Sequence, residues 1–436
     1  MDDKTLLGSV KIPAEIIKEA EKNIGDIAQF GKRVKKYSTQ NTTNLLDLIL
    51  VGSVKLDASD IHLEPEKEDA RLRVRIDGVL QDVAIFQKEP YENLLSRLKL
   101  LSKIKLNIVD KPQDGRFTIE AGKLLIDTRT SSLPAEYGES IVMRILNPKS
   151  LMSLENLGLR EDLYKIFEKE IKRPNGMIVV TGPTGAGKTT TLYAFLMKLQ
   201  NPEIEIITIE DPIEYHIKGI LQTQVAPEKG YNFSEGLKSI IRQDPDVILV
   251  GEIRDSETAK IALQASLTGH LVFSTLHTND AAGTIPRLVD LGANPLSIAP
   301  ALKMVISERL IRKACKECLA LVKPPEKELL EIKSGLKNIL SKLGIKKDLD
   351  KIKTARIKEG GCKACNFTGY KGRKGIFEVF LVDSEMEKFI LKDPSVSSIK
   401  ELLIKKGMIT IWQSGLIEVI EGETTLEEVK KVVESD

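Results

Sequence analysis

Apolar and polar positions alternate with the period of a β-strand in the first third of the chain. In "RLRVRIDGVLQDV", residues 71–83, the side chains of Leu72, Val74 and Ile76 would share one face of a strand, with arginines on the other. Asp77-Gly78 follows directly and is typical of a hairpin turn. A helical pattern and a second group of strands come next, which predicts a small α+β domain.

From residue 176 to about residue 310, short apolar runs alternate with helical patterns. The runs "MIVVTG", "EIEIITIE", "DVILVGE" and "HLVFSTLH" have no polar face, as expected for buried strands of a mainly parallel α/β sheet. The end of the chain is helical, with Thr424 or Thr425 as a plausible N-cap before "LEEVKKVV".

These patterns divide the chain into five parts, and we expect an α/β fold. A lysine-rich segment after residue 322 is interpreted as a solvated helical or disordered excursion. The expected parts are an N-terminal helical arm or linker (1–43), an α+β domain (44–149), an α/β core (150–310), a cysteine-bounded subdomain (311–372) and a C-terminal helical domain (373–436).

Composition narrows the functional class. The chain has 436 residues, of which 42% are hydrophobic and 29% charged, as in soluble globular proteins. Its net charge of +2 and its 5% of aromatic residues do not favour a nucleic-acid binder. The sequence lacks an apolar run long enough to span a bilayer, and its acidic start does not resemble a signal peptide. We therefore expect a cytoplasmic protein, and if it works at a membrane, a partner must hold it there.

A glycine-rich stretch, "TGPTGAGKTTT" at residues 181–191, has the spacing of a phosphate-binding loop and stands between a strand pattern and a helix pattern. Backbone N–H groups and the helix N-terminus would hold phosphates, Lys188 would reach the β and γ oxygens, and Thr189 would bind Mg²⁺. The expected nucleotide-binding residues are Gly182, Pro183, Thr184, Gly185, Ala186, Gly187, Lys188, Thr189 and Thr190.

Polar side chains follow three of the predicted parallel strands. Glu210, Glu252 and His277 come at strand ends, where an open α/β sheet binds its ligand. Each acid alone would more often be a helix cap, but phosphoryl hydrolysis needs one group for the metal and another for water. We assign Glu252 to Mg²⁺ and Glu210 to water, and the reverse assignment remains open. His277 is a further catalytic candidate, whereas His270, at the far end of the same strand, is expected to be structural or to contact a neighbouring subunit.

All four cysteines occur in two C-x-x-C pairs, Cys315 with Cys318 and Cys362 with Cys365. Four thiolates in this pattern suit tetrahedral Zn²⁺. Their long separation exceeds that of a compact zinc ribbon, and the alternatives are two redox motifs or reduced structural thiols. We predict zinc.

The motifs together resemble those of the type II/type IV secretion ATPase superfamily. "GPTGAGKTTT", "ITIEDPIEY", "RQDPDVILVGEIRD" and "LTGHLVFSTLHTND" are similar to its Walker A, Asp-box, Walker B and His-box motifs. The cysteine pairs, "ASDIHLEP" and "GLIEVIEGETTLEEV" narrow the resemblance to the type II secretion and type IV pilus assembly ATPases (GspE/PilB), from about residue 44 to the end. The resemblance implies a RecA-like core after a PAS-like domain.

The resemblance also implies function. Family members form hexameric rings, and their ATP hydrolysis drives a membrane-embedded platform that assembles pilins or pseudopilins. By motif position, Arg129 and Arg144 resemble arginines that reach the phosphates from the upstream domain. By residue type alone, both could simply decorate strand faces. Larger members carry a further N-terminal domain that docks at the membrane, so we expect either a shorter natural version or docking through another route, such as an adaptor.

Two other functions compete with an assembly motor. A pilus retraction ATPase belongs to the same superfamily, but the paired cysteines and the long C-terminal region argue against it. A nucleic-acid-dependent ATPase is disfavoured by the near-neutral charge, and no nucleic-acid partner is expected.

Overall fold

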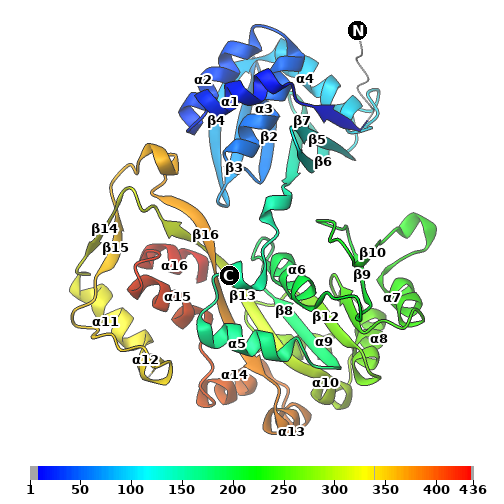
Figure 1. Ribbon diagram of the computed structural model, residues 1–436, viewed down its shortest axis with the longest axis vertical. Coiled ribbons are helices and arrows are strands. Elements are labelled where there is room, and N and C mark those ends of the chain that lie inside the picture. Colours follow the sequence, from blue (N-terminus) through cyan, green and yellow to red (C-terminus); the bar gives the residue numbers. More distant parts are fainter. Residues whose placement is uncertain (1–7, 338, 434–436) are drawn as a thin grey trace. The chain divides into compact units, whose positions relative to one another are not determined.

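The computed structural model describes residues 8–337 and 339–433 (Figure 1). The chain divides into two compact units. Unit 1 consists of residues 1–150, 315–319 and 357–372, and unit 2 consists of residues 151–314, 320–356 and 373–436. The cysteine-bearing segments are thus counted with unit 1, and the lysine-rich segment between them is counted with unit 2.

Unit 1 is built on a seven-stranded sheet, as far as the described residues show, with the order β1-β5-β6-β7-β2-β3-β4. The strands β1 and β5 are parallel, and the pairs from β5 to β4 are antiparallel. The strands are β1 (Ser9–Lys11), β2 (Asp60–Pro65), β3 (Asp69–Ile76), β4 (Val79–Gln87), β5 (Gln113–Ala121), β6 (Leu124–Ala135) and β7 (Gly138–Leu146).

Helices of unit 1 supply the partners for the apolar side chains of this sheet. They are α1 (Ala14–Asn23), α2 (Ile27–Ser38), α3 (Thr42–Lys55) and α4 (Lys88–Leu101). Ile16, Phe30 and Val34 lie in the same buried cluster as Leu72 and Val74 of β3. The region suggested as an N-terminal arm therefore contributes to this core over the residues that the structure describes; residues 1–7 of that region lie outside them.

Strand β3 has the alternation that its sequence predicts. Leu72 and Val74 are fully buried, and the arginines between them are half-buried on the other face. The backbone φ angles of Asp77 and Gly78 are 50° and 82°, the left-handed values that a tight hairpin turn requires. The predicted hairpin between β3 and β4 is confirmed.

The polar face of this sheet carries a row of charged residues on neighbouring strands. In the register of the sheet, Arg116 pairs with Arg129, and Arg129 pairs with Arg144. Asp60 pairs with Arg144 on one side and Arg75 on the other. Residues directly opposite one another on neighbouring strands share a face, so the carboxylate of Asp60 stands in a row of arginines.

Unit 2 contains the α/β core predicted for the middle of the chain. Within the described residues its sheet has seven strands in the order β10-β9-β11-β12-β8-β13-β16, and the pairs from β10 to β13 are parallel. The strands are β8 (Gly176–Thr181), β9 (Ile206–Glu210), β10 (Leu221–Gln224), β11 (Val247–Val250), β12 (Leu271–Leu276), β13 (Leu302–Ala314) and β16 (Tyr370–Leu381).

Both faces of this sheet are buried. Successive side chains of β8 point to opposite faces, so Met177 and Val179 lie in one apolar cluster, and Ile178 and Val180 lie in another. This explains why the strand sequences have no polar face. The helices of this part are α5 (Glu161–Glu170), α6 (Lys188–Leu199), α7 (Phe233–Ile241), α8 (Ser256–Leu267), α9 (Thr284–Asp290) and α10 (Pro295–Ala301).

The lysine-rich segment is helical but not a solvated excursion. Ile332, Leu336 and Leu340, spaced four residues apart, are buried together with Leu416 and Val429 of the C-terminal helices.

The remaining helices of the described residues are α11 (Glu326–Gly335), α12 (Ile339–Lys342), α13 (Ser384–Lys392), α14 (Val396–Lys405), α15 (Ile411–Ile420) and α16 (Leu426–Val433). The strands β14 (Leu319–Val322) and β15 (Thr354–Ile357) pair with each other. Short 3₁₀ turns occur at Pro148–Ser150, Leu154–Asn156, Pro227–Lys229 and Lys363–Cys365.

Candidate functional site

The glycine-rich loop connects β8 to α6, as its sequence context predicts. Lys188 is the first residue of α6, and its Nζ donates hydrogen bonds to the backbone oxygens of Gly182 (2.7 Å) and Pro183 (3.0 Å). The ammonium group is therefore held over the loop, at the N-terminus of a helix. Backbone N–H groups and the helix dipole favour an anion at such a position.

At two positions of the loop, the backbone conformation and the lack of space for a side chain require glycine. Gly182 and Gly187 have φ angles of 143° and 108°, which side-chain-bearing residues rarely adopt. A Cβ atom on Gly182 would lie 2.5 Å from the backbone oxygen of Glu308, and one on Gly187 would lie 2.2 Å from its Oε1. The loop is thus packed closely against β13, with its backbone as the binding surface, and it fits a phosphate group.

A cavity of about 160 Å³ lies beside the loop within unit 2. It brings together the strand-end residues that the sequence analysis selected, along with the start of α6. Its lining residues are Lys188, Thr189, Leu192, Tyr193, Glu210, Asp211, Pro212, Glu214, Leu249, Gly251, Glu252, Thr275 and His277. Carboxylate and hydroxyl oxygens suit Mg²⁺, so Thr189 and Glu252 are placed where they could hold that ion.

Glu210 ends β9 and is 4% exposed. Its Oε2 accepts a hydrogen bond from the hydroxyl of Tyr193, and its Oε1 accepts from Thr208 Oγ1 (2.6 Å) and Gln222 Nε2 (3.1 Å). Burial raises the pKa of Glu210, and these three donors act in the opposite direction. The result is a fixed carboxyl group whose affinity for a proton exceeds that of an ordinary glutamate.

Glu252, just after β11, lies between two cationic or titratable groups. Its Oε1 is 2.5 Å from Nη2 of Arg254, and its Oε2 is 3.5 Å from Nε2 of His277. Desolvation and the nearby Lys188 lower the pKa of His277, so the imidazole is mostly neutral at pH 7. His270 stands before β12 at its other end, and its Nδ1 lies 3.0 Å from the backbone oxygen of Ala265.

Two residues near the loop were not selected from the sequence. Glu308 on β13 is 3% exposed, and burial raises its pKa to about 8. Tyr193 lies on α6, and its hydroxyl contacts Glu210. A charged residue inside an apolar strand, as in "MVISERLI", is the signal that could have identified Glu308. Tyr193 has no comparable signal, since a tyrosine on a buried helix is ordinary.

Arg129 and Arg144 lie in unit 1, on adjacent strands, in register with each other. Arg144 Nε donates a hydrogen bond of 3.1 Å to Oδ1 of Asp60. Arg75 Nε lies 3.4 Å from Oδ2 of the same carboxylate, whose side chain is 8% exposed. The proposed role of these arginines at the phosphates remains a prediction.

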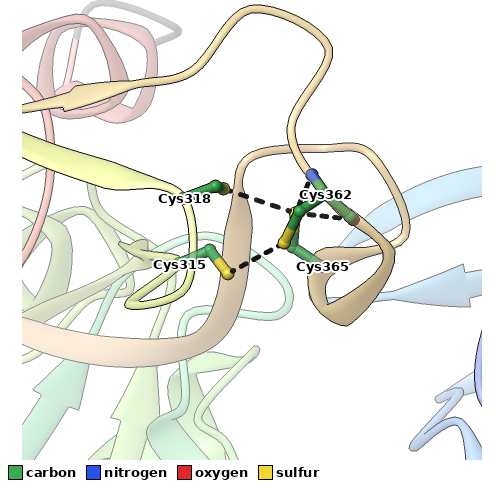
Figure 2. A group of neighbouring side chains, drawn as sticks. All are labelled: Cys315, Cys318, Cys362 and Cys365. Atoms are coloured by element: carbon green, nitrogen blue, oxygen red, sulfur yellow. Dashed lines mark hydrogen bonds between the residues drawn. The ribbon is translucent and has the colours of Figure 1, made fainter.

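The four cysteines converge within unit 1, where Figure 2 shows their thiols pointing toward one another. The Sγ atoms of Cys315 and Cys362 are 3.8 Å apart, those of Cys318 and Cys365 are 3.9 Å apart, and those of Cys362 and Cys365 are 3.7 Å apart. A tetrahedral site with Zn–S bonds of about 2.3 Å would place sulfur atoms about 3.8 Å apart. The group could hold a metal ion.

The thiols differ in their proton affinity. Burial raises the pKa of Cys315 and Cys318. Burial acts in the same direction on Cys365, but the backbone N–H groups of Cys362 and Gly369 donate to its Sγ at 3.2 Å, and the net pKa is lowered to about 7. Such N–H donors stabilise a thiolate, the form that binds metal.

In the described part of the chain, no helix is both long and apolar enough to cross a membrane.

Comparison with known proteins identifies the family of most of the chain. Residues 35–431 match the family described as Type II/IV secretion system protein. The type IV pilus assembly ATPase PilB of Thermus thermophilus is 45% identical over 378 residues, which are 86% of this chain and 41% of that protein. The type II secretion system protein E of Dickeya dadantii is 42% identical over 395 residues, which are 90% of this chain and 76% of that protein.

Solved structures show the same fold. The pilus retraction motor PilT with bound ADP has 26% sequence identity and a TM-score of 0.59, over 89% of this chain and 96% of that chain. The ATPase DotB of Legionella pneumophila has 20% identity and a TM-score of 0.64, over 90% of this chain and 95% of that chain. The predicted α/β fold class and the predicted resemblance are confirmed. The chain therefore belongs to the type II/IV secretion system protein family.

Proposed function

We propose that this chain is a motor ATPase that hydrolyses ATP with Mg²⁺ and drives the assembly of pilin-like subunits, in type IV pilus biogenesis or type II secretion. One observation supports the proposed hydrolysis of ATP. The phosphate-binding loop and the acids at the ends of β9 and β11 line a single cavity within unit 2. The names of the relatives support pilin-like subunits as the cargo, because these relatives are pilus assembly and type II secretion proteins.

The chain's residues divide the chemistry among them. Lys188 and the loop backbone bind the phosphates. Thr189 and Glu252 would hold Mg²⁺, which would neutralise charge on the phosphate oxygens. Glu210 orients the attacking water and accepts its proton. Its raised pKa makes it a stronger base than an exposed glutamate. His277, beside Glu252, contributes a neutral hydrogen-bonding group at the γ-phosphate.

Arginines of unit 1 are assigned a catalytic role in this proposal. A P-loop site gains much of its rate from guanidinium groups that stabilise charge in the transition state. We assign this role to Arg129 and Arg144, which stand together on one face of the unit 1 sheet. Six copies form a ring, and ATP hydrolysis rearranges its subunits and drives the platform protein. The chain works at the cytoplasmic side of the inner membrane through that partner or an adaptor.

A retraction motor is the second candidate, and its support is structural, since PilT shares the fold. Assembly is favoured by sequence, because identity to the PilB relative is 45%, against 26% to PilT. The clustered thiols of Cys315, Cys318, Cys362 and Cys365 support a zinc subdomain in this chain.

The purified full chain tests the activity. Phosphate release from ATP with Mg²⁺ is compared between wild type and Lys188→Ala, with circular dichroism as the check of folding. We expect the variant to be folded and inactive. The same assay with added duplex DNA addresses the nucleic-acid alternative, and we expect no stimulation. Hydrolysis by folded Lys188→Ala at the wild-type rate would refute the phosphate-loop assignment.

A further inference from the structure

The acid at the end of β9 is held by a residue of the helix that follows the phosphate loop. Tyr193 lies on α6, five residues after Lys188, and its ring is fully buried. Its hydroxyl donates to Oε2 of Glu210 and accepts a hydrogen bond from the backbone N–H of Glu214 (3.3 Å). The ring of Tyr215 contacts that of Tyr193 edge-on, with centroids 6.4 Å apart, and limits its movement.

A second residue donates a hydrogen bond to the other oxygen of this carboxylate. Gln222 lies on the edge strand β10, and its Nε2 donates to Oε1 of Glu210 (3.1 Å) and to the backbone oxygen of Tyr215 (3.0 Å). Its own Oε1 accepts from the backbone N–H of Ile217 (2.8 Å). The amide group is thereby fixed in one orientation, and both oxygens of Glu210 have side-chain donors.

Each donor affects how readily Glu210 takes up a proton. Burial raises the pKa of Glu210, and the hydrogen bonds from Thr208, Tyr193 and Gln222 lower it. The pKa of Tyr193 itself is raised by burial, so its hydroxyl keeps its proton and remains a donor. The other titratable groups that line the cavity are Lys188, Asp211, Glu214, Glu252 and His277.

We propose that Tyr193 and Gln222 are positioning residues for the reaction, which fix the orientation of the Glu210 carboxylate and set the strength of this group as a base. The inference rests on the proposed function, in which Glu210 accepts the proton of the attacking water. Because Tyr193 and Lys188 are on the same helix, the acid is tied to the element that binds the phosphates. Neither residue needs to contact the nucleotide to have this effect.

A purely structural role makes a different prediction. Buried acids in general need hydrogen-bond donors, so Tyr193 could serve only to satisfy Glu210. Its loss would then lower stability or the amount of active protein without changing how the rate depends on pH. The pH profile of kcat/KM separates the two, since its acidic limb reports the pKa of the essential base in the free enzyme.

The test uses the full chain with Tyr193→Phe, which removes one oxygen and keeps the ring. Loss of a donor to the carboxylate should move the acidic limb of kcat/KM to higher pH by roughly one unit. Gln222→Leu removes the second donor and should move the limb in the same direction by a smaller amount. ADP affinity should stay within about twofold of wild type in both variants, since neither residue belongs to the phosphate loop.

Tyr91→Phe is the matched control. Tyr91 is another fully buried tyrosine, in unit 1, and its hydroxyl donates to the backbone oxygen of Glu139. This variant should keep the wild-type acidic limb. An unshifted limb in both Tyr193→Phe and Gln222→Leu, with Glu210→Gln inactive, would overturn the positioning role and leave the proposed function intact. Full activity of Glu210→Gln would instead refute the assignment of Glu210 as the base. If Tyr193→Phe does not fold, the Gln222→Leu result decides the inference by the same criterion.

Discussion

Glu308 accepts a hydrogen bond of 2.7 Å from the hydroxyl of Thr191, directly behind the phosphate loop. Its carboxyl group is buried and close to Gly187, and the charge of Lys188 favours its ionised form. An ionised carboxylate here would repel phosphate groups, and the raised pKa of about 8 favours the uncharged form of the Glu308 carboxyl near neutral pH.

Because Glu308 is buried, we expect it to lower the free energy of unfolding as the pH rises. The pKa of Glu308 is raised from 4.5 to about 8 by folding, so its contribution to stability is full below pH 4.5 and is lost as the pH rises toward 8. Glu308→Gln keeps an oxygen for Thr191 and does not titrate. We therefore expect the free energy of unfolding of the variant to gain on wild type by up to about 1.4 kcal/mol per pH unit between pH 5 and 8.

Chemical denaturation of both proteins at several pH values measures this difference, because the other titrating groups are common to the two. Glu228→Gln, at an exposed position near α7, is the control and should follow wild type. Curves for Glu308→Gln and wild type that run parallel from pH 5 to 8 would contradict the account of Glu308.

The contacts of Asp60 lead to a second prediction, which concerns the effect of this residue on kcat through Arg144. Its carboxylate holds Arg144 and Arg75 in unit 1, and Ser59 Oγ donates to it at 2.8 Å. If Arg144 stabilises the transition state, Asp60→Asn should lower kcat about tenfold or more while ADP binding is retained, because a misplaced guanidinium loses most of its effect.

Glu64→Gln provides the comparison for Asp60→Asn. Glu64 lies on the same strand as Asp60 and forms an ion pair with Arg73, outside the row that contains Arg144. The Glu64→Gln variant should leave kcat within about twofold of wild type. Equal kcat values for Asp60→Asn and Glu64→Gln would argue against a catalytic role for the arginine row.

The cysteine cluster predicts bound zinc. The full chain purified with Zn²⁺ should contain one zinc per chain by elemental analysis, because the four Sγ atoms lie within 4.8 Å of one another and three pairs of them have the spacing of a tetrahedral site. Cys362→Ser should lose the metal and lower the melting temperature by roughly 5 °C or more, since a structural metal adds directly to stability. Lys363→Ser, at an exposed position in the same turn, should keep both. Wild-type protein without zinc after such a preparation would refute the site.

Much of the catalytic cavity could be predicted from the sequence because its positions are determined locally. Buried parallel strands have a recognisable pattern, and their carboxyl ends must meet at one edge, so Glu210, Glu252 and His277 could be grouped from the strand pattern alone. The same holds for the hairpin at Asp77-Gly78, where two residues need left-handed backbone angles.

Other features depend on contacts distant in sequence. Phe30 and Val34 are on an amphipathic helix, but nothing local says that its apolar face packs in the core of unit 1. Ile332 and Leu336 stand among lysines in the sequence, and their burial depends partly on the C-terminal helices, which are distant in the chain. Glu308 is close to the phosphate loop because β13 is next to β8 in the sheet, a neighbour relation that strand patterns do not encode.

The central claim is that Glu210 acts on a nucleotide bound at the phosphate loop. It is tested most directly by phosphate release from saturating ATP and Mg²⁺, comparing wild type with Glu210→Gln while the affinity for ADP is measured in parallel. The account predicts that the variant binds ADP as wild type does and hydrolyses ATP about 100-fold or more slowly. A folded Glu210→Gln variant that releases phosphate at the wild-type rate would contradict it.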